Sequence, residues 1–253
     1  MSYHAQYDAY HLLNDNEKWA FDGMIEAIAN AETSVTLPTR DLSSLSNSEI
    51  TQLFSNAWAA IRFDHPEFVW MTKGYGNNND YERWDGYDEQ TKFVVQFSYN
   101  ELADNPELHQ KEFEDAAERF LNRVRQEGSI LAMEQYIFEY FKTSVKYENS
   151  SLDQTAYAAL VNKRTVCAGV TLAVNYIFKR LGIPSYYLIG NTSGGSHAWN
   201  AVKIDGNWYY LDATPATDNT LTQNSYNSYF NVPYGQEFWA TVDYDTFPAS
   251  RFN

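Results

Sequence analysis

Apolar residues recur at helical spacing twice within the first 64 residues of the chain. The first set follows the polar residues 14–16, which suit a helix N-cap, and consists of Phe21, Met24, Ile25 and Ile28. The second set follows Ser46 and Ser48 and consists of Ile50, Leu53, Phe54, Ala57 and Ile61. The sequence DHPE at 64–67 is expected to end this second helix.

The pattern then changes to a strand and returns to helices. Apolar and aromatic residues alternate with other residues over 93–99, which predicts a half-buried strand. A long helix that ends near Gly128 is marked by Phe113, Ala117, Phe120, Leu121 and Val124. Another helix is predicted over 130–141, so the N-terminal half is expected to be mostly helical.

After Gly182 the chain breaks into short β-rich runs separated by turn sequences. This change predicts an α+β fold with an antiparallel sheet. We interpret NTSGGS, residues 191–196, as a flexible loop beside a cleft, and residues 217–229 as loops and short strands. The expected organisation is a helical region over 1–128 packed on a core over 129–253.

The single cysteine of the chain lies where a helix is predicted to begin. The residues Val170, Val174, Ile177, Phe178 and Leu181 fall on one helical face, and the sequence GIP at 182–184 is a stop signal. Free N–H groups and the helix dipole favour an anion at such an N-terminus, and therefore a thiolate at Cys167. The alternative is that Cys167 packs as a small buried apolar residue.

The sequence SHAWNAVKIDGNWYYLDAT, residues 196–214, predicts a β-hairpin. Its Asp-Gly pair, Asp205 and Gly206, is a strong signal for a two-residue loop between two strands. In that register Ile204 faces Asn207. A three-residue bulged loop would instead shift the alternation of side chains by one position.

The same register brings a histidine and an aspartate together. Trp199 faces Asp212, and His197 shares a face with Trp199, so Asp212 lies diagonal to His197 within reach of its ring. Taken separately, His197 and Asp212 could each be an ordinary polar residue at the end of a strand. Together with Cys167, they supply the nucleophile, base and orienting carboxylate of nucleophilic catalysis.

The composition and net charge of the chain favour some classes of binding partner and disfavour others. The chain carries a formal charge of −15 and its 18 Lys and Arg form no basic stripe, which disfavours nucleic acid. Its 20 Tyr, 15 Phe and 7 Trp favour contacts with peptides or sugars. The five histidines lack metal-ligand spacing, no phosphate-binding glycine loop is present, and no segment is long and apolar enough to span a membrane. We therefore expect neither a metal nor a cofactor.

The sequence resembles the transglutaminase-like superfamily of papain-like cysteine enzymes, in particular its bacterial members. The resemblance covers residues 132–218 and is carried by the blocks TAYAALVNKRTVCAGVTLA, LGIPSYYLIG and GSHAWNAVKIDGNWYYLDAT, with YFNV at 229–232 as a further block beyond this range. The Cys, His-Ala-Trp-Asn and Trp-Tyr-x-x-Asp blocks occur in family order. Upstream, DHPEFVW at 64–70 is similar to the Asp-x-Pro-Glu segment of some bacterial relatives.

The resemblance implies a papain-like core over 129–253, in which a helix carries the nucleophile at its tip and packs on an antiparallel sheet that bears the base and its partner. It assigns Cys167 as nucleophile, His197 as base and Asp212 as orienter. The sequence departs from the family at Val170, where relatives often carry an aromatic residue. It departs again in DATPATD, residues 212–218, where relatives often carry tryptophan, so we expect an unusual substrate groove.

An acyl transferase also needs donors for the oxyanion. The backbone N–H of Cys167 is expected to supply one of them. Tyr147, Asn149 and Tyr157 are candidates for the second, and Trp199 is a candidate for a substrate contact on the hairpin face. For each of these residues the alternative is a packing or turn role.

The activity implied by the resemblance is acyl transfer on protein glutamine carboxamides through a thioester, leading to cross-linking or deamidation. A cysteine protease or peptidase would use the same three residues, and an inactive protein-binding module is a third alternative. The expected partners are protein or peptide substrates, including cell-surface proteins. We expect a secreted or cell-surface protein whose signal lies outside this sequence, with a cytoplasmic location as the alternative.

Overall fold

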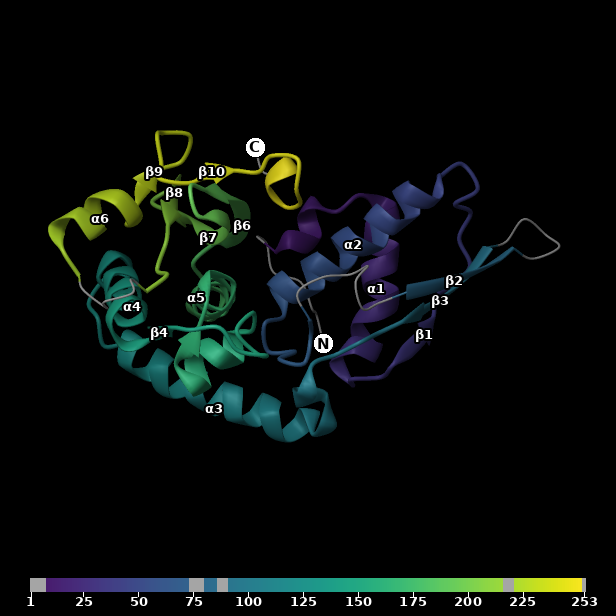
Figure 1. Ribbon diagram of the computed structural model, residues 1–253, viewed down its shortest axis with the longest axis horizontal. Helices are drawn as coiled ribbons and strands as arrows, with labels where there is room; N and C mark the ends of the chain where they lie inside the picture. Colours follow the sequence, from purple (N-terminus) through teal and green to yellow (C-terminus); the bar gives the residue numbers. More distant parts are fainter. Residues whose placement is uncertain (1–7, 73–79, 86–90, 216–220, 252–253) are drawn as a thin grey trace. The chain divides into compact units, whose positions relative to one another are not determined.

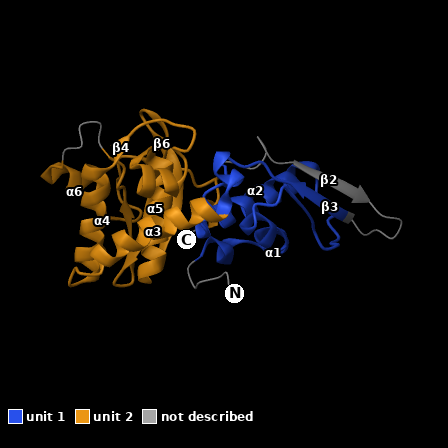
Figure 2. Ribbon diagram, turned by 90° about the horizontal axis from the view of Figure 1, so that it is seen from below, with its two compact units in different colours: residues 1–106 blue, residues 107–253 orange. Residues whose placement is uncertain are grey.

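The computed structural model describes residues 8–72, 80–85, 91–215 and 221–251. The chain divides into two compact units, Met1–Pro106 and Glu107–Asn253 (Figure 2). This division falls before the domain boundary that we predict after residue 128.

Helix α3 (Pro106–Val124) explains the difference, since its packing partners lie in the second unit. Phe113 meets the ring of Tyr176 edge to face, with ring centres 4.9 Å apart. Glu118 accepts a charged hydrogen bond of 2.8 Å from Arg180. The apolar spacing identifies α3 as a helix, but only these long-range contacts show which unit contains it.

The first unit contains the two helices that apolar spacing predicts. Helix α1 (Asp15–Ala29) begins after Asn14, and helix α2 (Asn47–Asp64) begins after Ser46. Each of these N-cap residues forms a capping box with the glutamate three residues later, which satisfies N–H groups that the first turn of a helix leaves without partners. The predicted helix start and the predicted end at DHPE are confirmed.

A three-stranded antiparallel sheet accompanies these helices. Its order is β1–β3–β2, with bounds Ser34–Thr36, Thr91–Gln96 and Asp80–Asp85. The strand predicted over 93–99 therefore begins earlier and ends at Gln96, while Tyr99 forms an isolated bridge with Met71. The N-terminal half is therefore less helical than predicted, because it also contains short strands, and the sequences of β1 and β2 show little alternation of apolar and polar residues.

The DHPE segment has a structural role in the first unit. The Asp64 carboxylate accepts the backbone N–H groups of Ala9 at 2.8 Å and Tyr10 at 2.9 Å. His65 Nδ1 lies 2.9 Å from Glu67 Oε1. The two Asp64 contacts hold the N-terminal segment against the end of α2.

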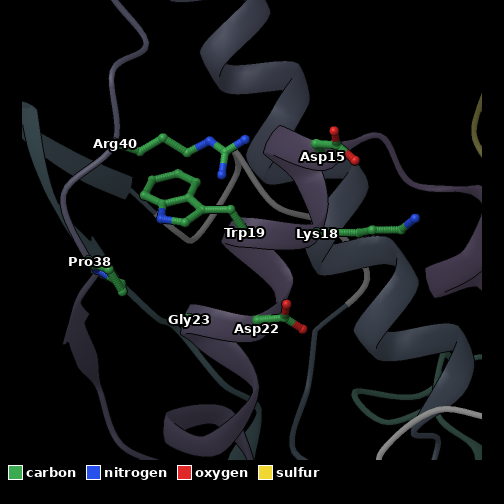
Figure 3. A pocket seen from close by; sticks show the side chains of 7 residues that line it. All are labelled: Asp15, Lys18, Trp19, Asp22, Gly23, Pro38 and Arg40. Atoms are coloured by element: carbon green, nitrogen blue, oxygen red, sulfur yellow. The ribbon is translucent and has the colours of Figure 1, made fainter.

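A cavity of about 370 Å³ opens on the first unit (Figure 3). Its lining residues are Asp15, Lys18, Trp19, Asp22, Gly23, Pro38 and Arg40. The Arg40 guanidinium lies 5.9 Å from the centre of the Trp19 ring and its Nε donates to Asn16 Oδ1 at 2.7 Å. This lining contains no cysteine, serine or histidine.

The second unit is built on a five-stranded antiparallel sheet of order β10–β6–β7–β8–β9. The strand bounds, in that order, are Thr241–Val242, Ser185–Thr192, Gly195–Ile204, Asn207–Leu211 and Val232–Pro233. Helix α5 (Cys167–Leu181) packs against β6 and β7 (Figure 1). The predicted α+β class, with the cysteine-bearing helix on an antiparallel sheet, is confirmed.

The two hairpins of this sheet set the register of the site. Ile204 pairs with Asn207 and Asn200 with Leu211, as the Asp-Gly signal predicts. Asp205 and Gly206 have φ angles of 49° and 85°, the left-handed conformation that this two-residue loop needs. The predicted loop over 191–196 is wrong, because only two residues separate β6 from β7 and the rest of that segment is paired.

Further helices and short strands complete the second unit. Helix α4 (Ile130–Ser144) matches the predicted helix, whereas helix α6 (Gln223–Tyr229) replaces the predicted loops and strands. A Thr222–Ser225 capping box starts α6, a polar signal that the apolar pattern does not reveal. The described residues also form the short helical elements η1 (Ala9–Leu12), η2 (Glu101–Asp104), η3 (Ala158–Asn162) and η4 (Ala249–Arg251). Among the described helices, none is long and apolar enough to cross a membrane.

A parallel pair of two-residue strands lies next to the start of α5. Strand β4 (Lys146–Tyr147) pairs with β5 (Arg164–Thr165), so Tyr147 is directly opposite Thr165. Since β5 ends two residues before Cys167, this pairing brings Tyr147 from 20 residues upstream to the tip of α5.

Candidate active site

Cys167 is the first residue of α5 and is partly exposed. The N-cap residue Val166 offers no side-chain cap, so the first N–H groups of the helix remain available to an anion. Gly169 allows the preceding segment to pack closely on this turn, because a Cβ at that position would lie 2.1 Å from Thr165 Oγ1 and 2.8 Å from the Asp153 carbonyl oxygen. The sulfur is therefore presented at a tightly packed helix tip.

His197 lies near the start of β7, directly opposite Gly190 of β6. A Cβ at Gly190 would lie 2.1 Å from the Thr241 carbonyl oxygen and 2.6 Å from the Trp199 ring, so glycine is needed there. Trp199 stacks on the imidazole with ring centres 5.9 Å apart. Close packing around the ring fixes its orientation.

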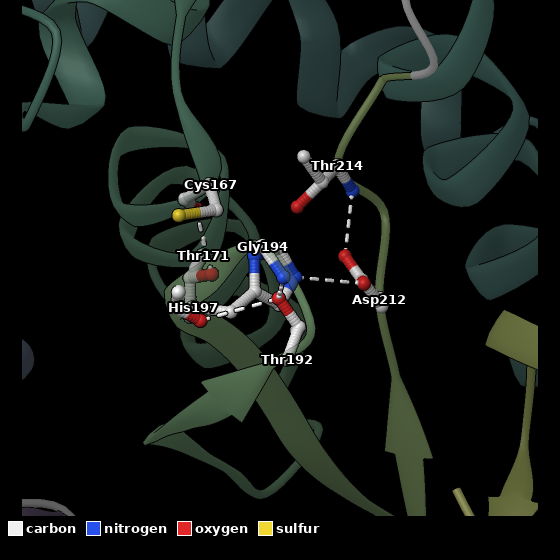
Figure 4. A network of polar contacts seen from close by, with 8 residues as sticks. Cys167, Thr171, Thr192, Gly194, His197, Asp212 and Thr214 are labelled. Carbon is white, nitrogen blue, oxygen red and sulfur yellow. Dashed lines mark hydrogen bonds and ion pairs between the residues drawn. The ribbon is translucent and has the colours of Figure 1, made fainter. Parts of the chain in front are cut away.

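Asp212 follows the last residue of β8 and is almost fully buried. Its backbone N–H donates to the Tyr229 carbonyl at 2.8 Å. Its Oδ2 accepts from His197 Nε2 at 2.9 Å, and its Oδ1 accepts from the Thr214 N–H at 3.0 Å (Figure 4). The His197 contact leaves Nδ1 as the ring nitrogen that can exchange a proton with the sulfur.

The charges of the ring and the carboxylate follow from these contacts. Burial alone would lower the pKa of His197, but hydrogen bonds and charge interactions with Asp212 and Cys167 raise it from 6.5 to about 9. Burial alone would raise the pKa of Asp212, yet the His197 bond, the charge of Lys142 and the Thr214 contact lower it. At neutral pH the site therefore holds an imidazolium and a carboxylate.

Asn200 connects the sheet to the helix that carries the cysteine. Its Nδ2 donates to the Thr171 carbonyl at 3.1 Å and lies 3.5 Å from Asn175 Oδ1. Thr171 Oγ1 in turn donates to the Cys167 carbonyl at 2.8 Å. This chain of contacts fixes the spacing between α5 and β7, and hence between the sulfur and the imidazole.

Lys142 is a site residue that the sequence does not reveal. It lies in the last turn of α4, where basic residues are common, but its side chain is buried and its Nζ lies 4.2 Å from the centre of the Tyr229 ring. Burial lowers the pKa of Lys142, and the charge of Asp212 opposes that effect. The positive charge of Lys142 therefore stabilises the ionised Asp212 carboxylate.

Tyr147 is the upstream candidate that the structure brings to the sulfur. Its side chain is 42% exposed and its hydroxyl interacts with the Cys167 side chain. Burial, together with charge interactions with Cys167, Asp153 and Asp212, raises its pKa above the ordinary value of 10. The hydroxyl consequently keeps its proton at neutral pH and can donate it in a hydrogen bond.

The other three candidates have packing or surface positions. Tyr157 is buried and its hydroxyl donates to Glu112 Oε2 of α3 at 2.6 Å, so it holds α3 rather than a substrate oxygen. Asn149 is exposed, and no contact of its side chain with the triad is present in the described residues. Trp199 is fully buried, so its expected substrate contact is replaced by packing beneath His197.

The arrangement provides a partly exposed sulfur, a protonated imidazole, a buried carboxylate and a phenol beside one helix N-terminus. Such a set can attack an acyl carbon, protonate a leaving group and donate to an oxyanion. Within the described residues, no three His, Cys, Asp or Glu side chains gather as metal ligands. Residues 216–218 of the divergent DATPATD sequence lie outside the described residues.

Comparison with known proteins gives one family match. Residues 114–213 match the model of the transglutaminase-like superfamily. The matched range contains Cys167, His197 and Asp212 and excludes the DHPEFVW segment. No curated protein matches the sequence.

Solved structures show more distant similarity. A TGase crystal structure aligns with a TM-score of 0.41 and 13% identity over 58% of this chain and 47% of that chain, less than half of its length. The periplasmic domain of TgpA from Pseudomonas aeruginosa, bound to ethylmercury, aligns with a TM-score of 0.33 and 12% identity over 57% of this chain and 68% of that chain. Both scores lie below 0.5, so neither likeness indicates an activity for this chain.

Proposed function

We propose that this protein is a cysteine acyltransferase acting on glutamine carboxamides of proteins or peptides, because residues 114–213 match the model of the transglutaminase-like superfamily. The observation that supports this most strongly is the contact chain from Cys167 through His197 to the buried Asp212. A sulfur, an imidazole and a carboxylate in series are the groups needed to form and resolve a thioester.

In the first step, the Cys167 thiolate attacks the carbonyl carbon of the carboxamide. A carbon–sulfur bond forms, and the oxygen takes up the negative charge. The imidazolium of His197 then gives its Nδ1 proton to the nitrogen, the carbon–nitrogen bond breaks and ammonia leaves. Asp212 holds the ring at Nε2 throughout and stabilises its positive charge.

Two donors are available for the negative oxygen. The backbone N–H of Cys167 belongs to the free first turn of α5, and the Tyr147 hydroxyl interacts with the Cys167 side chain. Donors that are fixed before the reaction stabilise the oxyanion more than water does, because they need no reorientation. We assign Tyr147 this second role.

In the second step, neutral His197 removes a proton from an amine or a water as that nucleophile attacks the thioester. The carbon–sulfur bond breaks and the thiolate is restored. A lysine amine would give an isopeptide cross-link, whereas water would give glutamate and complete a deamidation. A peptidase would use the same groups on a backbone amide.

The test is an intact-mass measurement of a glutamine-containing protein incubated with the enzyme and a labelled primary amine. We expect a mass increase equal to the amine minus ammonia, or a gain of about 1 Da if water replaces the amine. The Cys167→Ser variant should give neither product. Fragments of the glutamine-containing protein would instead show a peptidase, and an unchanged mass together with an unreactive Cys167 would show a binding module.

A further inference from the structure

A second cavity, of about 200 Å³, lies in the second unit next to the triad. It is lined by Asn227, Ser228, Val232, Glu237, Phe238 and Trp239. Pockets that bury drug-sized ligands measure roughly 300–1,000 Å³, so this cavity has the size for one side chain.

Trp239 connects the cavity to the catalytic histidine. Its ring meets the His197 ring at 64° with centres 4.7 Å apart, and meets Tyr229 edge to face at 5.4 Å. The indole is nevertheless 41% exposed. A group in the cavity would therefore share a wall with the imidazole that exchanges protons at the sulfur.

The wall of the cavity is held in place by the sheet. Phe238 stacks on Tyr210 with ring centres 4.7 Å apart. The backbone N–H of Tyr234 donates to the Trp208 carbonyl at 3.0 Å, and the N–H of Gly235 lies 3.4 Å from the Tyr210 hydroxyl. The cavity is thus preformed, which reduces the entropy cost of filling it.

The lining of the cavity carries a single negative charge. Glu237 is its single ionisable residue, it is exposed, and in the described part of the chain it forms no ion pair. Val232 and the rings of Phe238 and Trp239 offer apolar surface for an aliphatic stem, and an indole face attracts cations. A long side chain with a cationic end satisfies both features.

We propose that this cavity is a substrate subsite for a basic side chain, lysine or arginine, close in the substrate to the reacting residue. The proposal rests on the proposed function only in that the occupant belongs to a substrate of Cys167. Glu237 supplies the charge preference, and Trp239 supplies the contact surface beside His197.

The subsite is tested with three alkylating probes of Cys167: chloroacetamide, N-chloroacetyl-pentylamine and the mono-N-chloroacetyl derivative of pentane-1,5-diamine. Each rate constant is divided by the rate constant with free cysteine. We expect the cationic probe to react about threefold to tenfold faster than its neutral analogue, the range of one ion pair plus one cation–π contact. Glu237→Gln should remove that preference.

The matched control is Glu107→Gln, which removes the same charge from an exposed site at the start of α3. A preference that survives Glu237→Gln, or that falls equally in Glu107→Gln, would overturn the subsite and indicate attraction by the net charge of −15. A titration with pentylammonium, monitored by the NMR chemical shift of the Trp239 indole N–H, measures binding in the cavity without any reaction at Cys167. If Cys167 is inert but this shift saturates, the proposed function fails while the cavity remains a cation-binding site. If Cys167 reacts but the Trp239 signal does not shift, the subsite is overturned while the proposed function stands.

Discussion

At the scale of single residues, the state of the site is decided by competition at His197. Burial disfavours the charged ring, but Asp212 on one nitrogen and Cys167 near the other reverse that effect and raise the pKa to about 9. Asp212 remains ionised in spite of burial for the complementary reason. The two partners therefore keep each other charged, and removing either partner changes both.

The His197 ring sets the alkaline limit of the proposed activity. Because its folded pKa is about 9, the proton that leaves with ammonia is present at lower pH and is lost as the pH rises through that value. We expect the rate of ammonia release to fall above about pH 9. His197→Ala should reduce it by about 10²–10⁴-fold and remove this alkaline limb. A wild-type rate that keeps rising through pH 10 would contradict the assignment of the ring as the acid.

Tyr147 and Tyr157 form a matched pair for testing the oxyanion donor. Tyr147→Phe removes the hydroxyl beside Cys167 and should reduce kcat by about 10²–10³-fold with a smaller change in KM. Tyr157→Phe removes a hydroxyl that binds Glu112, so we expect a change in stability and little change in kcat. Steady-state kinetics of both variants checks this. Equal losses of kcat would remove the special role of Tyr147.

At the scale of elements, helix α4 contributes two buried ionisable side chains that contact segments next to the site. Its Lys142 lies against the Tyr229 ring and lowers the pKa of Asp212 by its charge. About two turns earlier in the same helix, Glu134 accepts a hydrogen bond of 2.8 Å from Asn231 Nδ2, and Asn231 immediately precedes the residue that begins β9. The helix thus fixes both the triad carboxylate and one wall of the Trp239 cavity.

The Lys142 charge should be visible in the acid limb of activity. Its loss in Lys142→Met leaves the apolar stem but raises the pKa of Asp212, so that the carboxylate protonates at a higher pH. We expect the acid limb of kcat to move to higher pH, while Lys111→Met, an exposed cation on α3, leaves it in place. An acid limb that stays unchanged in Lys142→Met would mean that the lysine serves packing alone.

Glu134 gives a prediction for stability. Burial raises its pKa from 4.5 to about 7 in the folded protein, so its contribution to stability is complete below pH 4.5 and is lost as the pH rises towards 7. Glu134→Gln keeps an oxygen for Asn231 but cannot ionise. We expect it to raise the free energy of unfolding by on the order of 3 kcal/mol at pH 8.5 and much less at pH 4.5. Urea titrations at both values test this, and an equal effect at both would refute it.

At the scale of the whole molecule, local signals in the sequence predict much of the site. The Asp-Gly loop fixes the register that places His197 beside Asp212, and apolar spacing places Cys167 at a helix tip. Lys142 and Trp239 could not be found in this way, because their roles arise from contacts between segments that are far apart in sequence. The same limit applies to Tyr157, whose partner Glu112 lies on a helix that we expected in the other domain.

The most direct measurement is the rate at which iodoacetamide alkylates Cys167 at pH 6, compared with free cysteine and with His197→Ala. An ordinary thiol is less than about 1% ionised at that pH, so a sulfur paired with an imidazolium should react at least about tenfold faster than free cysteine. His197→Ala should return the rate to the ordinary value. A wild-type rate no greater than that of free cysteine would contradict the account of Cys167 as an activated nucleophile.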